Sequence, residues 1–267
     1  MGSRIQPPLP REHGAWPMFA VPVLVGIGAA GAWSVSVILF ALTAFGFFLL
    51  RYPLMLAVKS RAREARLDAL RWSAIYGSAT VVLGAALILV SQQWLLVPIG
   101  ALGFVSLVVY LWHVAHRAEM TAVGEWLGIA GLALGAPGAY LVGTGTLDGT
   151  ALALYLLDVL YFGGTVFYIK FKVREQPRLA KSDARWLARL WAGRVTLAYH
   201  AMVIALVALF AMLGMLPALA VIAFVPMVCK AIGGVMTQPA RLNIRRLGFI
   251  ELGLTVVFAV VVLAAYR

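Results

Sequence analysis

Residues 151–170 read ALALYLLDVLYFGGTVFYIK, and Asp158 and Lys170 carry the two charges in this run. About 20 predominantly apolar residues are what an α-helix needs to cross the hydrocarbon core of a membrane. Only 12% of the 267 residues are charged, compared with about 25% in a typical soluble domain. Comparable apolar runs span residues 17–33, 34–50, 72–91, 94–112, 125–142, 151–168, 195–213, 216–235 and 247–266. The sequence therefore predicts an all-α, polytopic membrane bundle of about nine transmembrane helices, forming one domain over residues 1–267 with no soluble domain.

The connections between these runs alternate sharply in charge. Of the 22 lysines and arginines, only Arg267 falls on the opposite side from one alternate set of connections. Because basic loops stay in the cytoplasm, the N-terminus is predicted to be cytoplasmic and the C-terminus to lie outside. Membrane orientation accounts for the formal charge of +12, and no nucleic-acid partner is expected. The expected partners are membrane lipids, and oligomeric state stays open.

Two cytoplasmic connections are long and basic. Lys59, Arg63 and Arg66 recur at helical spacing, which predicts an amphipathic helix along the membrane surface. The later connection, residues 170–194, is expected to break at Pro177. It then resumes as a basic helix with tryptophans at the interface.

Several ionisable residues lie within the predicted spans or at their cytoplasmic ends, where charge is costly and usually functional. Asp158 is about 18 Å along its helix from Lys170 and shares a face with Tyr161, Thr165 and Lys172. This polar stripe fits either a cavity wall or a packed polar seam. The ligand-binding candidates are Arg51, Lys59, Lys170, Arg174, Arg194, Lys230, Arg245 and Glu251.

The candidates for acid–base work are Glu12, His13, Glu119 and Asp158. Glu12 and His13 belong to the stretch REHGAW, which precedes the first apolar run. Glu251 is expected to pair with a residue on another helix. His200 fits a hydrogen-bonded core histidine more simply than a ligand. No metal site is expected, since HxxH at residues 113–116 is a weak signal and Cys229 is the single cysteine.

The motifs REHGAW, GEWLGIAGLALGAP, YFGGTVFYIKFKVREQPR and RRLGFIE resemble those of the YwiC-like family of bacterial membrane proteins. The resemblance implies a bacterial cytoplasmic membrane and supplies no chemistry.

The topology also resembles, more distantly, that of UbiA-type prenyltransferases, which hold a prenyl diphosphate through magnesium and aspartate-rich loops. Here the corresponding loops read RYPLMLAVKSRAREARLDAL and KFKVREQPRLAKSD, which are basic. The resemblance thus implies a cytoplasm-facing cavity for an amphipathic anion such as an isoprenoid diphosphate. Arginine and lysine would hold this anion directly, without Mg²⁺.

Two other classes of function stay open. A transporter or ligand-handling protein without covalent chemistry would equally use polar residues within spans. A haem-binding variant of it would rely on His13 and His200. A structural subunit of a larger membrane complex is the remaining class.

Overall fold

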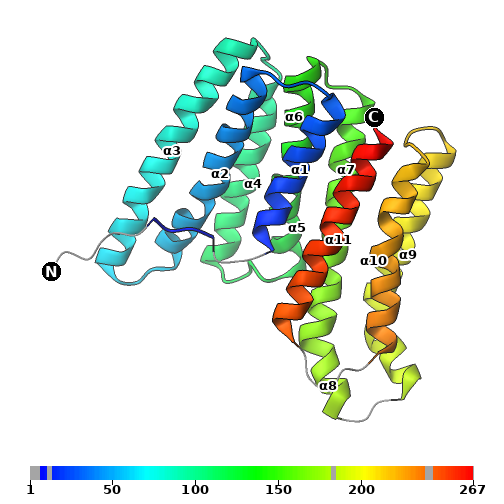
Figure 1. Ribbon diagram of the computed structural model, residues 1–267. Coiled ribbons are helices and arrows are strands. Elements are labelled where there is room, and N and C mark those ends of the chain that lie inside the picture. Colours follow the sequence, from blue (N-terminus) through cyan, green and yellow to red (C-terminus); the bar gives the residue numbers. More distant parts are fainter. Residues whose placement is uncertain (1–6, 11–13, 182–184, 238–242, 267) are drawn as a thin grey trace. The chain divides into compact units, whose positions relative to one another are not determined.

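Helices make up all the regular structure in the residues that the computed structural model describes, which are 7–10, 14–181, 185–237 and 243–266. Eight helical segments are long and apolar enough to cross a membrane, and the 16-residue α1 is shorter. Each predicted apolar run falls on one of these nine segments, which confirms the polytopic helical fold (Figure 1). The helices are α1 (Ala15–Ala30), α2 (Val35–Lys59), α3 (Arg63–Ser91), α4 (Leu96–Ala115), α5 (Ala122–Ala133), α6 (Gly135–Thr144), α7 (Gly149–Lys170), α8 (Gln176–Lys181), α9 (Trp186–Met212), α10 (Leu219–Met236) and α11 (Ile244–Ala265).

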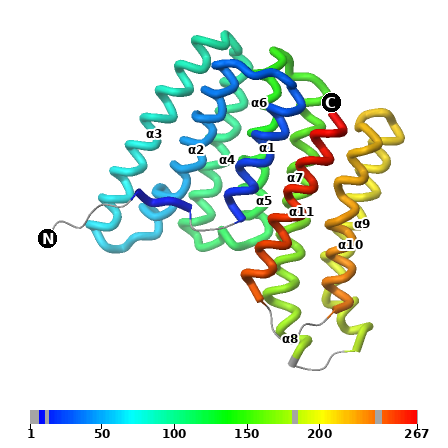
Figure 2. The backbone as a smooth tube through the Cα atoms, viewed as in Figure 1, coloured from blue at the N-terminus to red at the C-terminus, as the bar shows by residue number. Residues whose placement is uncertain are grey.

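The chain divides into two compact units, residues 1–155 and 156–267, and α7 passes from the first to the second (Figure 2). In the first unit α2 packs along α3, and α1 packs along α6. One apolar core of this unit consists of Val23, Ile27, Val37, Phe40, Leu87, Leu96, Ala139, Leu141 and Val142. In the second unit α10 lies against both α9 and α11.

Local sequence sets where several helices begin and end. The side chains of Ser34, Thr121 and Asn243 accept hydrogen bonds from backbone N–H groups in the first turns of α2, α5 and α11. Gly31 and Gly145 end α1 and α6 with φ of 65° and 79°, a left-handed conformation that favours glycine. These caps satisfy backbone groups that lipid cannot.

Each of the two expectations for the basic connections is met only in part. Residues 63–71 are the first turns of the 29-residue α3, and only Ser60–Ala62 separate α3 from α2, so no separate surface helix forms. The helical path does not break at Pro177: it runs on from α7 through a π-helix, Phe171–Glu175, into α8, where Pro177 takes the second position. A helix does resume at Trp186, where α9 begins, as predicted.

Small residues let α1 and α6 approach closely. A Cβ added at Gly26 would meet the carbonyl oxygen of Ala136 and lie 2.8 Å from the Cβ of Ala139. The two helices thus touch backbone to backbone, which is how helices associate in lipid.

Replacing Gly26 with alanine is expected to destabilise the first unit by about 1–3 kcal/mol, because the new methyl group forces α1 away from α6. Gly100→Ala is the matched control, since nothing lies within 4 Å of a Cβ at that position. The measurement is unfolding in mixed micelles by titration with a denaturing detergent. Equal stability of the two variants would contradict the close contact between α1 and α6.

Candidate functional site

A buried ion pair joins α10 to α11 in the second unit. The Lys230 ammonium donates to both carboxylate oxygens of Glu251, at 2.6 and 2.8 Å, and the side chains are 9% and 11% exposed. The prediction that the partner of Glu251 lies on another helix is confirmed. Two charges taken out of water are tolerable only when paired in this way.

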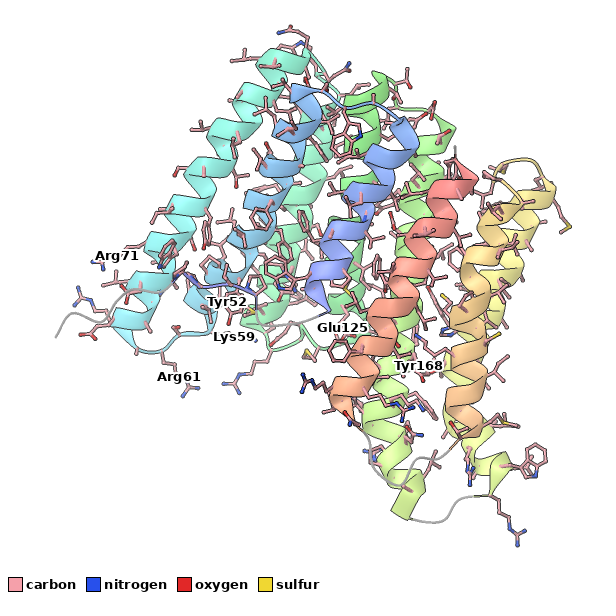
Figure 3. The ribbon with its side chains drawn as sticks, viewed as in Figure 1. Tyr52, Lys59, Arg61, Arg71, Glu125 and Tyr168 are labelled. Carbon is pink, nitrogen blue, oxygen red and sulfur yellow. The ribbon has the colours of Figure 1, made fainter. Side chains whose placement is uncertain are left out.

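The ring of Tyr168 on α7 brings a second lysine next to this ion pair. Lys230 Nζ lies 4.4 Å from the ring centroid and Lys172 Nζ lies 5.5 Å from it. Figure 3 labels Tyr168 in the second unit. The ring fits against α10 because Gly234 has no side chain: a Cβ there would lie 2.6 Å from the Tyr168 hydroxyl. Aromatic faces attract ammonium groups, so the ring holds both cations close together.

Lys172 is buried without a counter-charge. Its ammonium donates to the Gly234 carbonyl oxygen at 2.9 Å, and no carboxylate among the described residues forms an ion pair with it. An ammonium group has three N–H donors, so two remain for other acceptors. Lys172 lies in the π-helical segment Phe171–Glu175, and such segments often occur at functional sites.

Asp158 is buried deeper along α7, and its side chain is fully enclosed. It is 0% exposed, and neither carboxylate oxygen has a hydrogen-bond partner among the described residues. Tyr161, one turn further on, donates to the Thr255 hydroxyl at 3.4 Å, and Thr255 donates to the backbone oxygen of Glu251 at 2.8 Å. Three members of the predicted stripe, Asp158, Tyr161 and Lys172, are therefore buried in the protein, which favours a packed polar seam over an open cavity wall.

His200 on α9 has one satisfied and one unsatisfied ring nitrogen. Nδ1 lies 2.7 Å from the Thr196 carbonyl oxygen, so it carries the proton, and Nε2 is left as a buried acceptor with no partner among the described residues. A Cβ at Gly164 on α7 would lie 3.3 Å from Nε2, so this nitrogen faces α7. The sequence predicted a hydrogen-bonded core histidine, and this describes Nδ1 but not Nε2.

The predicted site residues of the first unit have local partners. Lys59 pairs with Glu119 at 2.7 Å, with side chains 43% and 15% exposed. The hydrogen bond from Lys59 lowers the pKa of the Glu119 carboxyl below its usual range. Arg51 stacks on the ring of Tyr110 with its guanidinium carbon 4.1 Å from the centroid. Figure 3 labels Lys59 with Tyr52 and Arg61 in this unit.

A narrow cleft beside Arg51 is lined by Pro10, Phe48, Arg51, Tyr52, Met55 and Tyr110. Trp16 of the REHGAW stretch donates to the Pro10 carbonyl oxygen at 3.2 Å, which ties the start of α1 to the chain before it. Glu12 and His13 lie outside the described residues. Their assignment to the site therefore stays a prediction.

The remaining basic candidates are in the second unit and do not converge on one point. Arg174, Arg194 and Arg245 are exposed, whereas Lys170 is partly buried. Arg194 folds back onto Trp191, and Arg245 lies over Phe249 with 5.8 Å to the ring centroid. A shallow surface hollow is lined by Asn243, Arg245, Arg246, Phe249 and Ile250. Among the predicted residues, the structure brings together Lys230 with Glu251 and Lys59 with Glu119.

Sequence reasoning did not single out Tyr168 or assign a role to Lys172. Two features of the sequence could have indicated them. Tyr168 and Lys172 are spaced i,i+4, and the glycine pair Gly233–Gly234 leaves room for a large side chain from another helix. Within the described part of the chain, no group of three or more histidine, cysteine, aspartate or glutamate side chains could hold a metal ion.

Comparison with known proteins confirms the resemblance to the YwiC-like family. The model of the YwiC-like protein family matches residues 9–140. The uncharacterised protein YwiC of Bacillus subtilis is 27% identical over 178 residues, which cover 67% of this chain and 72% of that protein. An uncharacterised protein of Haemophilus influenzae is 26% identical over 255 residues, covering 95% of this chain and 96% of its own. No solved structure matches the chain.

Removing one member of the buried ion pair is expected to destabilise the protein more than removing both. Glu251→Leu leaves the Lys230 ammonium buried and unpaired, which costs about 3–5 kcal/mol. The double variant Lys230→Met/Glu251→Leu carries no buried charge and should recover most of that loss. Unfolding by denaturing detergent checks this, and a double variant no more stable than Glu251→Leu would contradict it.

The Lys59–Glu119 pair is expected to give a coupling free energy of about 0.2–1 kcal/mol at neutral pH in a double-mutant cycle. The folded-state pKa of Glu119 is lowered, so this stability is present above the unfolded-state pKa and is lost as pH falls through the folded-state pKa. The cycle is measured with Lys59→Ala and Glu119→Ala at neutral and acidic pH. A coupling that persists in strong acid would contradict the assignment.

Proposed function

The chain is a multi-pass membrane protein similar to the YwiC-like family, and we propose that its second unit binds the anionic head of an amphipathic ligand and carries the ligand across the membrane unchanged. The observation that carries this proposal is Lys172, a buried cation that no described carboxylate neutralises. We further propose that the protein resides in the cytoplasmic membrane of a bacterium.

The charge balance around Tyr168 favours an anion. Lys230 and Lys172 contribute two positive charges near the ring, and Glu251 contributes one negative charge, already used by Lys230. A phosphate or carboxylate at Lys172 would complete the balance and accept its two remaining N–H donors. Intramembrane charges of this kind commonly mark a substrate or ion pathway.

The position of Lys172 suits a ligand that enters from the predicted cytoplasmic end. It follows Lys170 by two residues, close to the basic connection that contains Arg174. The neighbouring rings of Tyr168 and Phe171 are buried and apolar in character. A ligand with a charged head and an apolar tail could therefore place the head at Lys172 while its tail stays among apolar side chains or lipid.

The distance between the buried charged residues favours transport of an unchanged ligand over catalysis at a single active site. Asp158 and Lys172 are 14 residues apart on one helical path, which is about 21 Å at 1.5 Å per residue. A general acid must come within hydrogen-bond reach of the group it protonates, so Asp158 could not act on an anion held at Lys172. Transfer of a prenyl group without Mg²⁺ stays a prediction, and it would require Lys59 to leave Glu119 for the diphosphate.

Lys172→Met is expected to weaken binding of a short amphipathic anion about 10- to 100-fold, because one charge-assisted contact is lost. The probes are geranyl diphosphate, geranic acid and uncharged geraniol, titrated against the protein in mild detergent by calorimetry. Geraniol should bind no better to the wild type than to the variant. Comparison of the two anions distinguishes a phosphate head from a carboxylate head.

Arg185→Met is the matched control, since it removes an exposed cation from the same unit and should leave affinity almost unchanged. Equal affinities of wild type and Lys172→Met would refute the binding site. Uptake of labelled geranyl diphosphate into proteoliposomes then distinguishes a carrier from a transferase. Uptake of a probe whose mass is unchanged supports a carrier, whereas release of diphosphate supports a transferase.

A further inference from the structure

Asp158 has no role in holding the anion, yet it is buried at a cost that the fold does not offset. We propose that Asp158 is a proton-binding site, and that its proton crosses the membrane with the anionic ligand. This inference rests on the proposed carrier function for its ligand. The binding of a proton at Asp158 can be tested without that ligand.

Asp158 forms no ion pair with any residue that the structure describes. Among the described residues, the titratable or charged groups that the neighbouring helices bring close to α7 in the second unit include Tyr199 and His200 of α9, Lys230 of α10 and Glu251 of α11. Lys230 is held by two hydrogen bonds to Glu251, and Tyr199 donates to the Leu160 carbonyl oxygen at 2.8 Å. His200 presents an acceptor, which cannot satisfy a carboxylate.

An ionised carboxylate without donors is among the most costly groups in a membrane interior. A protonated carboxyl group carries no charge and needs partners for one O–H and one carbonyl oxygen only. Both oxygens of Asp158 lack partners among the described residues, so binding a proton relieves the larger part of the cost. A buried, protonated carboxyl group can release its proton when water or a ligand reaches it.

Polar groups lead from Asp158 toward the anion site. Tyr161 follows Asp158 by three residues on α7, and its hydroxyl donates to Thr255, which in turn donates to the backbone oxygen of Glu251. The Glu251 carboxylate then holds Lys230, which lies over the same ring as Lys172. This series of contacts joins Tyr161 to the anion site, and it begins one helical turn from Asp158.

The binding and release of the proton at Asp158 balance in atoms and charge. A proton from water joins the Asp158 carboxylate to give the neutral acid, and it leaves again as that O–H bond breaks on the other side. One proton carried with a singly charged anion moves no net charge. The membrane potential would therefore neither drive nor oppose the cycle for such a ligand, whereas a diphosphate carried with one proton would still move net negative charge.

Infrared spectroscopy of the reconstituted protein tests the proton site directly. Wild type at neutral pH is expected to show the carbonyl stretch of a protonated carboxyl group, which Asp158→Asn should abolish. Asp68→Asn should keep the band, because Asp68 is an exposed carboxylate paired with Arg71. No such band in wild type, or a band that survives in Asp158→Asn, would overturn the proposal.

Proton coupling is tested in proteoliposomes that contain a trapped pH-sensitive dye. External geranyl diphosphate is expected to acidify the lumen with wild type and not with Asp158→Asn, while calorimetry shows that the variant still binds the probe. Uptake of the probe without acidification would overturn the coupling. If Lys172→Met binds the probe normally while the infrared band follows Asp158, the carrier proposal fails and the proton site stands.

Discussion

The bilayer interior supplies no hydrogen bonds, so every polar group placed there must find its partner within the protein. In the second unit this constraint selects the pair Lys230–Glu251, which ties α10 to α11. Tyr168, Lys172 and Gly234 are arranged around that pair, and Thr255 links it to Tyr161. The constraint is not met everywhere: the buried groups left without a partner among the described residues include both carboxylate oxygens of Asp158 and Nε2 of His200.

The two units use their charges differently. In the first unit, Lys59 pairs with Glu119 and Arg51 lies over the ring of Tyr110, so both contacts join α2 to α4 or to the connection that follows α4. In the second unit, charged side chains are buried. Burying a charge within a membrane costs free energy, so buried charges there usually mark functional sites. The family match over residues 9–140 falls on the first unit. The relative from Haemophilus influenzae extends the similarity over the second.

The helical segments could be predicted from sequence because a span is a local property of about 20 residues. Periodicity predicted that Asp158, Tyr161 and Lys172 share one helix face and left open whether this face is packed, and the spacing of Glu251 from Arg245 and Arg246 predicted a partner on another helix. The choice of Lys230 as that partner could not be predicted, since it depends on how α10 and α11 are rotated about their axes. The same is true of Lys59 with Glu119, which are 60 residues apart.

The π-helical turn at Phe171–Glu175 has a consequence for how this region can vary. A π turn holds one more residue than an α turn, so it behaves as a one-residue insertion absorbed within a continuous helix. Deleting one residue after Lys172 would restore the ordinary winding and leave Gln176 on nearly the same face of the helical path. Gln176 would then still face the Thr237 carbonyl oxygen, to which it donates at 3.0 Å. This segment can therefore change in length by one residue while the helical path beyond it keeps its orientation.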